Sequence, residues 1–260
     1  MCVSQAQSNS PDKPSLVWPS VDELLAQSRL LRAATSGGTA NVYVYEMAGR
    51  KFLVKTFAKH NFLMRWLFGR KTIRNEWSIL QALKKSGVQE VPKVYALLES
   101  YTLVMEFVDG KQLQGGKHYG KDTMPGQPFF ERLRAMLWHC HQLGFAHGDF
   151  RRANVMIRND GSPCVIDWAT ASFCPVNTPK WHFLRRGFNS QMQKSDRYTL
   201  VKMLTDYYPE MISEQDRQAA RASWMLQIGH FLRRYLYRHG IKEWVGRARH
   251  GKQRQKNLNR

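Results

Sequence analysis

The feature that most restricts how this chain can fold is a polar segment in its middle, followed by a short apolar run that ends in a carboxylate. Asp149 and Asn154 lie in the segment His147–Asn154, and Asp167 comes thirteen positions after Asn154. The intervening residues 155–166 contain two short runs of β-forming residues around an Asn-Asp-Gly turn, which is the pattern of a β-hairpin. A hairpin would bring Asn154 and Asp167 together, so the fold must place an amide and two carboxylates near one point.

Oxygen ligands in this arrangement suit the transfer of a phosphoryl group. Asp149 could receive or orient the proton of an acceptor hydroxyl, while Asn154 and Asp167 could hold Mg²⁺ against the phosphates of a donor. Taken alone, each carboxylate would fit a hydrated surface turn equally well. The joint spacing of all three residues favours the catalytic interpretation.

The spacing H-x-D-x-x-x-x-N with a later Asp resembles the protein-kinase-like superfamily, and the resemblance covers about residues 32–208. It implies an α+β, bilobal fold, with a small antiparallel-sheet N-lobe that carries one helix and a larger helical C-lobe. It also implies ATP and Mg²⁺ as cofactors. The order of patterns along the chain agrees, because strand-like segments come first and helical ones later.

Two upstream residues fit the same family. Lys55 closes an apolar strand within the strand pattern of residues 42–57, and Glu76 lies on the apolar face of a helix expected over residues 72–85. A carboxylate on a buried face needs a cation. The resemblance implies that Lys55 is this cation and that the pair orients the α- and β-phosphates of ATP; each residue alone would also fit a solvent-facing charge.

The nucleotide-binding segments match the family less closely. Gly37 and Gly38 lie in a run of small residues that aligns only in part with the glycine-rich loop, yet small residues still allow backbone N–H groups to approach a phosphate. The strand and hinge at Tyr101–Gly110 resemble the segment that holds adenine, which implies contacts from the backbone around Glu106 and Val108. A plain turn and an ordinary hairpin strand are the alternatives.

The C-terminal part reads as helical. Pro128 suits the first turn of a helix that ends at Gly144, and further helical patterns cover about 196–208, 214–238 and 241–248. The expected organisation is a flexible tail (1–20), a kinase-like N-lobe (21–108), a kinase-like C-lobe (109–212) and a basic helical C-terminal extension (213–260).

Several departures from eukaryotic-type protein kinases point to a branch of the superfamily. His-Gly-Asp replaces His-Arg-Asp, Asp-Trp-Ala replaces Asp-Phe-Gly, and only 28 residues separate Asp167 from Asp196. These segments resemble the bacterial lipopolysaccharide kinases (Kdo/heptose kinases) and the RIO-like group. The resemblance implies a lipopolysaccharide core sugar, another lipid-linked saccharide or a protein Ser/Thr as acceptor. Arg151 stands where protein kinases carry a phosphate-contacting Lys, and it could bind the γ-phosphate bidentately.

Two other functions remain open. Aminoglycoside and choline kinases share the His-Gly-Asp and Ile-Asp-Trp segments, but they usually carry a His-Pro-Gly step where this chain has Arg151–Ala153. A non-catalytic, nucleotide-binding pseudokinase scaffold is the second alternative. The intact set of Lys55, Glu76, Asp149, Asn154 and Asp167 argues against it.

The charge balance implies an anionic partner. The chain has 40 Lys+Arg and 20 Asp+Glu, a formal net charge of +20. The surplus concentrates in residues 51–74 and 221–260, and the first of these encloses the apolar run Asn61–Gly69. That run suits an interfacial element on an anionic membrane, although a short helix packed on the lobe is an equal alternative. No RRM, KH or zinc-finger motif is present, which argues against nucleic acid.

The remaining sequence features concern location. No stretch approaches 18 consecutive apolar residues, and residues 1–20 lack the apolar run of a signal peptide. The four cysteines show no metal-ligand spacing, which favours a reduced compartment, with Cys140 as a buried apolar residue. We therefore expect a cytoplasmic protein that associates peripherally with the inner face of the cytoplasmic membrane.

Overall fold

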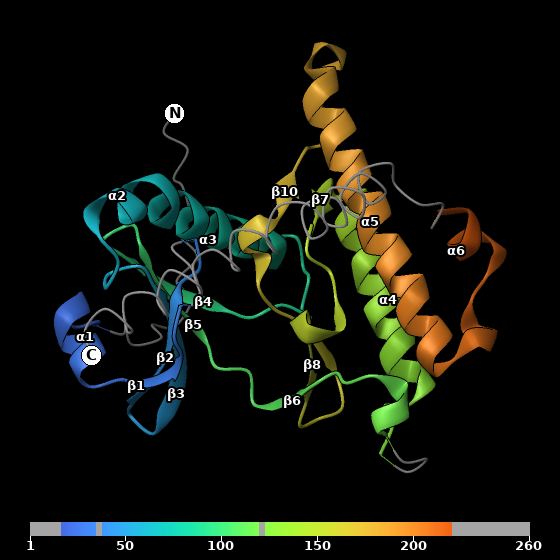
Figure 1. Ribbon diagram of the computed structural model, residues 1–260. Coiled ribbons are helices and arrows are strands. Elements are labelled where there is room, and N and C mark those ends of the chain that lie inside the picture. Colours follow the sequence, from blue (N-terminus) through green and yellow to red (C-terminus); the bar gives the residue numbers. More distant parts are fainter. Residues whose placement is uncertain (1–16, 35–37, 120–122, 220–260) are drawn as a thin grey trace, which may run out of the picture. The chain divides into compact units, whose positions relative to one another are not determined.

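The computed structural model describes residues 17–34, 38–119 and 123–219, and these residues form two compact units (Figure 1). The N unit contains residues up to Ile73 and Tyr95–Phe107, and the C unit contains Arg74–Val94 and residues from Val108 onward. The boundary expected between the lobes, after residue 108, lies one residue from the boundary after Phe107, and residues 74–94, expected in the N-lobe, group with the C unit.

Helices and strands are both well represented, which confirms the α+β fold class. The α-helices of the described residues are α1 (Val21–Ala26), α2 (Phe62–Met64), α3 (Arg70–Lys85), α4 (Gln127–Gln142), α5 (Phe183–Tyr207) and α6 (Glu214–Ala219). The strands there are β1 (Arg29–Arg32), β2 (Asn41–Met47), β3 (Arg50–Thr56), β4 (Val94–Leu98), β5 (Thr102–Glu106), β6 (Gly110–Gln112), β7 (Phe145–Ala146), β8 (Val155–Arg158), β9 (Pro163–Val165) and β10 (Ser172–Phe173).

The N unit is built on a five-stranded sheet in the order β1-β2-β3-β5-β4. Strands β2 and β3 form the hairpin expected over residues 42–57, and β3 also pairs in antiparallel register with β5. The hairpin turn has positive φ at Ala48 (51°) and Gly49 (70°), the two-residue geometry whose twist matches that of the strands. In this register Lys55 lies between Val42 and Leu103.

One face of this sheet packs on α1. Phe52 and Val54 of β3 belong to a buried apolar cluster that also contains Leu24 of α1, and Trp18 packs against the cluster. Side chains alternate along a strand, so Lys55 leaves β3 through the opposite face. Ser20 caps α1 with a reciprocal capping box, in which its side chain accepts from the backbone N–H of Glu23. The packed structure therefore begins before residue 21, inside the expected tail.

The C unit is dominated by α4 and α5, which lie side by side in Figure 1. Pro128 occupies the first turn of α4, as expected, and Cys140 is buried on the same helix. Strands β8 and β9 form the expected hairpin, β8 also pairs with β6, and β7 pairs with β10. The expected start of the later helix near residue 196 was wrong, because α5 begins at Phe183.

Some sequence-based expectations lie outside the described residues. They are Gly37, Cys2, the helical patterns beyond α6 and the basic segment 221–260. Within the part of the chain that the structure describes, no helix combines the length and the apolar content needed to cross a bilayer.

The aromatic cluster under the N-unit sheet generates a stability prediction. Phe52 is 1% exposed and meets the rings of Trp18 and Tyr95 edge-on, with centroids 5.0 and 5.2 Å away. We expect Phe52→Ala to lower the free energy of unfolding by about 3–5 kcal/mol, since the cavity cannot be filled by its neighbours. Urea unfolding measures this loss, and Leu31→Ala, at a 50%-exposed position on β1, should change it by less than about 0.5 kcal/mol.

Candidate active site

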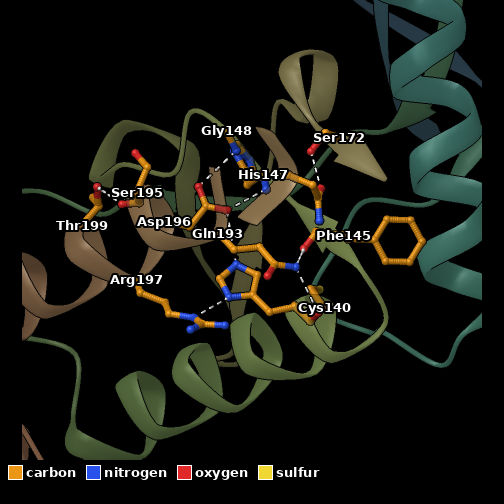
Figure 2. A network of polar contacts seen from close by, with 12 residues as sticks. Cys140, Phe145, His147, Gly148, Ser172, Gln193, Ser195, Asp196, Arg197 and Thr199 are labelled. Atoms are coloured by element: carbon orange, nitrogen blue, oxygen red, sulfur yellow. Dashed lines mark hydrogen bonds and ion pairs between the residues drawn. The ribbon is translucent and has the colours of Figure 1, made fainter. Parts of the chain in front are cut away.

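A buried carboxylate on α5 fixes the start of the polar segment that follows β7. Asp196 is 1% exposed, and its Oδ2 and Oδ1 accept hydrogen bonds from the backbone N–H groups of His147 (2.7 Å) and Gly148 (3.0 Å). Figure 2 shows the Asp196 side chain pointing at both residues. Gly148 has φ 79°, a left-handed conformation that glycine adopts without a steric penalty. The backbone leading into Asp149 is therefore held in one orientation.

His147 connects this loop to the strand end that precedes Asp167. Its Nε2 lies 3.0 Å from the carbonyl oxygen of Ile166, and its Nδ1 accepts from the backbone N–H of Asp149 at 3.2 Å. These partners require a neutral imidazole with the proton on Nε2. Burial lowers the pKa of His147, which favours the same neutral form.

Asp149 and Asn154 lie together on this loop, as the spacing predicts. Asn154 Nδ2 donates to the backbone oxygen of Asp149 (2.8 Å) and to its carboxylate Oδ2 (3.0 Å). Arg151 Nε lies 3.1 Å from the same Oδ2, and both side chains of this ion pair are substantially exposed, 60% for Arg151 and 43% for Asp149. An exposed pair of this kind contributes little to stability, so Arg151 orients Asp149 more than it anchors the fold.

The β8–β9 hairpin brings the backbone just before Asp167 against Asn154. The backbone N–H of Ile166 donates to the carbonyl oxygen of Asn154 at 2.9 Å. Asp167 then adopts φ 67° and ψ 63°, a left-handed conformation that is uncommon for a residue with a side chain and that concentrates at functional sites. The structure therefore gathers Asp149, Asn154 and the backbone of Asp167 in one region of the C unit.

Glu76 of α3 contacts the residue directly after Asp167. Its carboxylate is 1% exposed, and Oε1 accepts from the backbone N–H of Trp168 at 3.2 Å. The residue directly before Glu76 contacts the same segment: Asn75 Nδ2 donates to the carbonyl oxygens of Ala169 (3.0 Å) and Ala171 (2.9 Å). Asn75 and Glu76 of α3 therefore hold the short segment that follows Asp167 by hydrogen bonds to its backbone.

The other predicted site residues are placed as follows. Lys55 is 7% exposed on β3, and Glu106 ends β5; both belong to the N unit, as does Gly38. Val108 begins the second part of the C unit, and Gly37 is outside the described residues. The pairing of Lys55 with Glu76 and the nucleotide contacts of the other four residues stay predictions.

Two residues that sequence reasoning did not assign to the site extend the network around Asp196. His141 Nε2 lies 3.3 Å from Asp196 Oδ2, and Arg197 Nε donates to His141 Nδ1 at 3.1 Å. Because Nδ1 accepts a hydrogen bond, the imidazole is neutral, and burial lowers the pKa of His141 in agreement. The sequence did contain an indication: Met192, Asp196 and Leu200 follow at helical spacing, which puts a carboxylate in a core stripe.

The chain matches known proteins over most of this region. A family model described as the protein kinase domain matches residues 32–228. Similar curated proteins include the serine/threonine-protein kinase AGC1-7 of Arabidopsis thaliana, 27% identical over 66% of this chain and 34% of its own. Protein kinase PVPK-1 of Phaseolus vulgaris is 27% identical over 65% of this chain and 28% of its own. The matched region therefore spans about a third of these relatives.

The left-handed backbone at Gly148 can be tested against a matched glycine. A β-carbon there would lie 3.0 Å from the carbonyl oxygen of Thr170 and would overlap Cε of Met192, whereas Gly161, with φ 78°, has open space around it. We expect Gly148→Ala to lower the free energy of unfolding by about 2–3 kcal/mol and Gly161→Ala by about 1 kcal/mol. Equal losses in denaturant unfolding would show that the contacts around Gly148 are unimportant.

The two buried histidines generate a prediction about pH. Their pKa values are lowered in the folded state, so the unfolded chain binds more protons as the pH falls below about 6.5, and stability decreases there by up to about 1.4 kcal/mol per histidine per pH unit. We expect His141→Gln to remove one of these contributions and to reduce the loss of stability between about pH 7.5 and about pH 5.5 by roughly 1 kcal/mol. The exposed His139 on the same helix supplies the control variant, His139→Gln, and an identical pH dependence of both variants would contradict the interpretation.

Proposed function

Because the chain belongs to the protein kinase domain family, we propose that it is an ATP- and Mg²⁺-dependent phosphotransferase that moves the γ-phosphate to a hydroxyl group. The observation that carries the proposal is the joint placement of Asp149, Asn154 and Asp167. Asn154 is hydrogen-bonded to Asp149 at 2.8 and 3.0 Å, and its backbone is bonded to the residue before Asp167 at 2.9 Å. Phosphoryl transfer needs this combination of a proton-accepting carboxylate and oxygen ligands for the metal.

The donor set of Asn154 and Asp167 fits magnesium. Asn154 uses its Nδ2 group for both hydrogen bonds to Asp149, which leaves the amide Oδ1 as the atom to offer a cation. An amide oxygen and a carboxylate are the hard ligands that Mg²⁺ prefers, and phosphate oxygens would complete such a site. Magnesium, when bound, would neutralise negative charge on the phosphates.

We propose that Asp149 receives or orients the proton of the acceptor hydroxyl. The contacts with Asn154 and Arg151 both use Oδ2 of this carboxylate, which favours Oδ1 as the atom that receives or orients the proton. Arg151 is 60% exposed and sits beside Asp149, so its guanidinium could also bind the transferred phosphate. Asp149 and Arg151 are thus the proposed catalytic residues.

The remaining nucleotide contacts are proposed for residues around the N-unit sheet. Lys55 would bind the α- and β-phosphates, and Glu76 would hold its ammonium group in place. Backbone groups at Gly37 and Gly38 would approach the phosphates, while those around Glu106 and Val108 would bind adenine. The burial of Lys55, at 7% exposed, supports a role that a solvent-facing lysine would not have.

For the acceptor we propose a lipopolysaccharide core sugar or another lipid-linked saccharide at the inner membrane. The apolar run Asn61–Gly69 supports this choice, because four of its large side chains are exposed: Phe62 (72%), Leu63 (54%), Trp66 (58%) and Phe68 (46%). Arg65 and Arg70 line a surface pocket of about 210 Å³ in the same segment. Exposed aromatic groups beside arginines suit an anionic membrane surface.

A protein Ser/Thr hydroxyl is the second candidate acceptor. The relatives named serine/threonine-protein kinases support it, although only at 27% identity. An aminoglycoside- or choline-type small-molecule kinase and a non-catalytic pseudokinase are retained as competing functions, and one labelling experiment separates them all.

That experiment follows the γ-phosphate. We expect γ-labelled ATP to transfer its label to the lipid or saccharide fraction of source-cell extracts, and Asp149→Asn to slow this transfer by about 10²–10⁴-fold, because a general base is lost while nucleotide binding persists. In Asp167→Asn, which lacks a proposed Mg²⁺ ligand, nucleotide affinity should no longer change when Mg²⁺ is added. Asp160→Asn, in the exposed β8–β9 turn, is the matched control and should leave transfer unchanged.

The distribution of label distinguishes the alternatives. Label in the protein fraction would support a Ser/Thr acceptor, and label on a soluble small molecule would support the aminoglycoside or choline class. Nucleotide binding without transfer to any fraction would indicate a pseudokinase. Full turnover in Asp149→Asn would rule out the proposed mechanism.

A further inference from the structure

An exposed apolar surface lies at the start of α5, in the same unit as Asp149 and Asp167. We call it the 176–188 surface. Its large side chains are exposed to solvent: Val176 (74%), Trp181 (73%), Phe183 (68%), Leu184 (75%) and Phe188 (52%). Five large apolar side chains exposed within thirteen residues of chain are uncommon in a protein that has no binding partner there.

The first turns of α5 stand clear of the rest of the C unit. Every residue from Phe183 to Phe188 is exposed, so no face of this part of the helix is packed. In Figure 1 these turns extend beyond the end of α4. With about 100° between successive residues, Phe183, Leu184 and Phe188 fall within an arc of about 140°, and Arg185 and Arg186 lie on the remaining side. The helix start is therefore amphipathic, with its apolar arc turned to solvent.

The arginines hold this arrangement in place. Arg185 Nη2 donates to the carbonyl oxygen of Phe173 at 2.8 Å, and Arg186 Nη1 donates to that of Thr178 at 2.7 Å. Farther along the helix, Asn189 accepts from the Ser172 hydroxyl at 2.5 Å and donates to the Gly144 carbonyl at 3.2 Å. The exposed apolar arc is thus presented by a helix that is tied to β10 and to the end of α4.

The charge of the segment selects the kind of partner. Between Asp167 and Asp196 the chain has Lys180, Arg185, Arg186 and Lys194 and no acidic residue. Segment 221–260 of the same chain has eleven Lys/Arg and one acid, so it is electrostatically unsuited to cover this surface. A second copy would bring the same positive surface. An external anionic partner fits better.

We propose that the 176–188 surface docks on an anionic lipid bilayer. A bilayer interface offers hydrocarbon to the aliphatic and phenyl groups, the headgroup level to Trp181, and phosphates to the cations. A polyanion without an apolar phase would leave Leu184 and Phe183 in water. The inference extends the proposed function by adding a membrane contact on the C unit, separate from Asn61–Gly69.

The test uses the full chain and vesicles of phosphatidylcholine, with or without about 30% phosphatidylglycerol. We expect flotation with the anionic vesicles only, weakened by salt. The triple variant Phe183→Ser/Leu184→Ser/Phe188→Ser should reduce the partition coefficient by about tenfold or more. The matched variant Leu30→Ser/Leu31→Ser, at exposed β1 positions (49% and 50%), should bind like the wild type. An unchanged thermal midpoint would show that the triple variant is folded.

Further arms separate this proposal from its alternatives. Lys180→Gln/Lys194→Gln should weaken binding to anionic vesicles, and Asp167→Asn should bind normally, so vesicle binding is judged independently of phosphate transfer. Three results would overturn the proposal. The first is equal recovery with neutral vesicles. The second is wild-type binding by the folded triple variant, in which case loss of binding in Phe62→Ser/Trp66→Ser would assign the membrane contact to Asn61–Gly69. The third is a concentration-dependent dimer that the triple variant abolishes without any change in vesicle binding.

Discussion

The candidate active site depends on one buried carboxylate. Asp196 is almost completely removed from water, which is costly unless its oxygens are hydrogen-bonded. Its donors are two successive backbone N–H groups, of His147 and Gly148, together with the His141 imidazole. Since successive amides can both face one carboxylate only if the peptide between them is turned, the same contacts that satisfy Asp196 fix the direction in which the chain enters Asp149.

Hydrogen bonds connect this loop to the β8–β9 hairpin. The His147 imidazole bonds to the carbonyl oxygen of Ile166, and the Ile166 N–H donates to the carbonyl oxygen of Asn154, so the loop and the hairpin are joined at two positions. Asp167 then takes a left-handed conformation that costs of order 1–3 kcal/mol and persists only where neighbours over-determine it. The bond from Trp168 N–H to buried Glu76 supplies such a constraint on the following residue.

The parts of this arrangement that sequence could predict are those with a periodic or spaced pattern. Alternation identified β2 and β3, and the Asn-Asp-Gly turn identified the β8–β9 hairpin that brings Asn154 and Asp167 together. The start of α5 was missed because the core stripe of this helix begins only at Met192, and Phe183, Leu184 and Phe188 before it are exposed rather than packed in the core. Asp196 was missed for a related reason: once the helix is started at residue 196, the core stripe that contains the carboxylate cannot be seen.

The length of α5 gives its exposed start a mechanical consequence. The helix has 25 residues and carries the Asp196 anchor eight positions after Phe188, a separation of about 12 Å along the axis. Because the helix is also hydrogen-bonded to β10 and to the end of α4, the distance between its exposed start and Asp196 is fixed. If the 176–188 surface rests on headgroups, the loop held by Asp196 is kept at a fixed height above the bilayer. Such a constraint favours an acceptor that is itself attached to the membrane, and it would give no advantage with a freely diffusing small molecule.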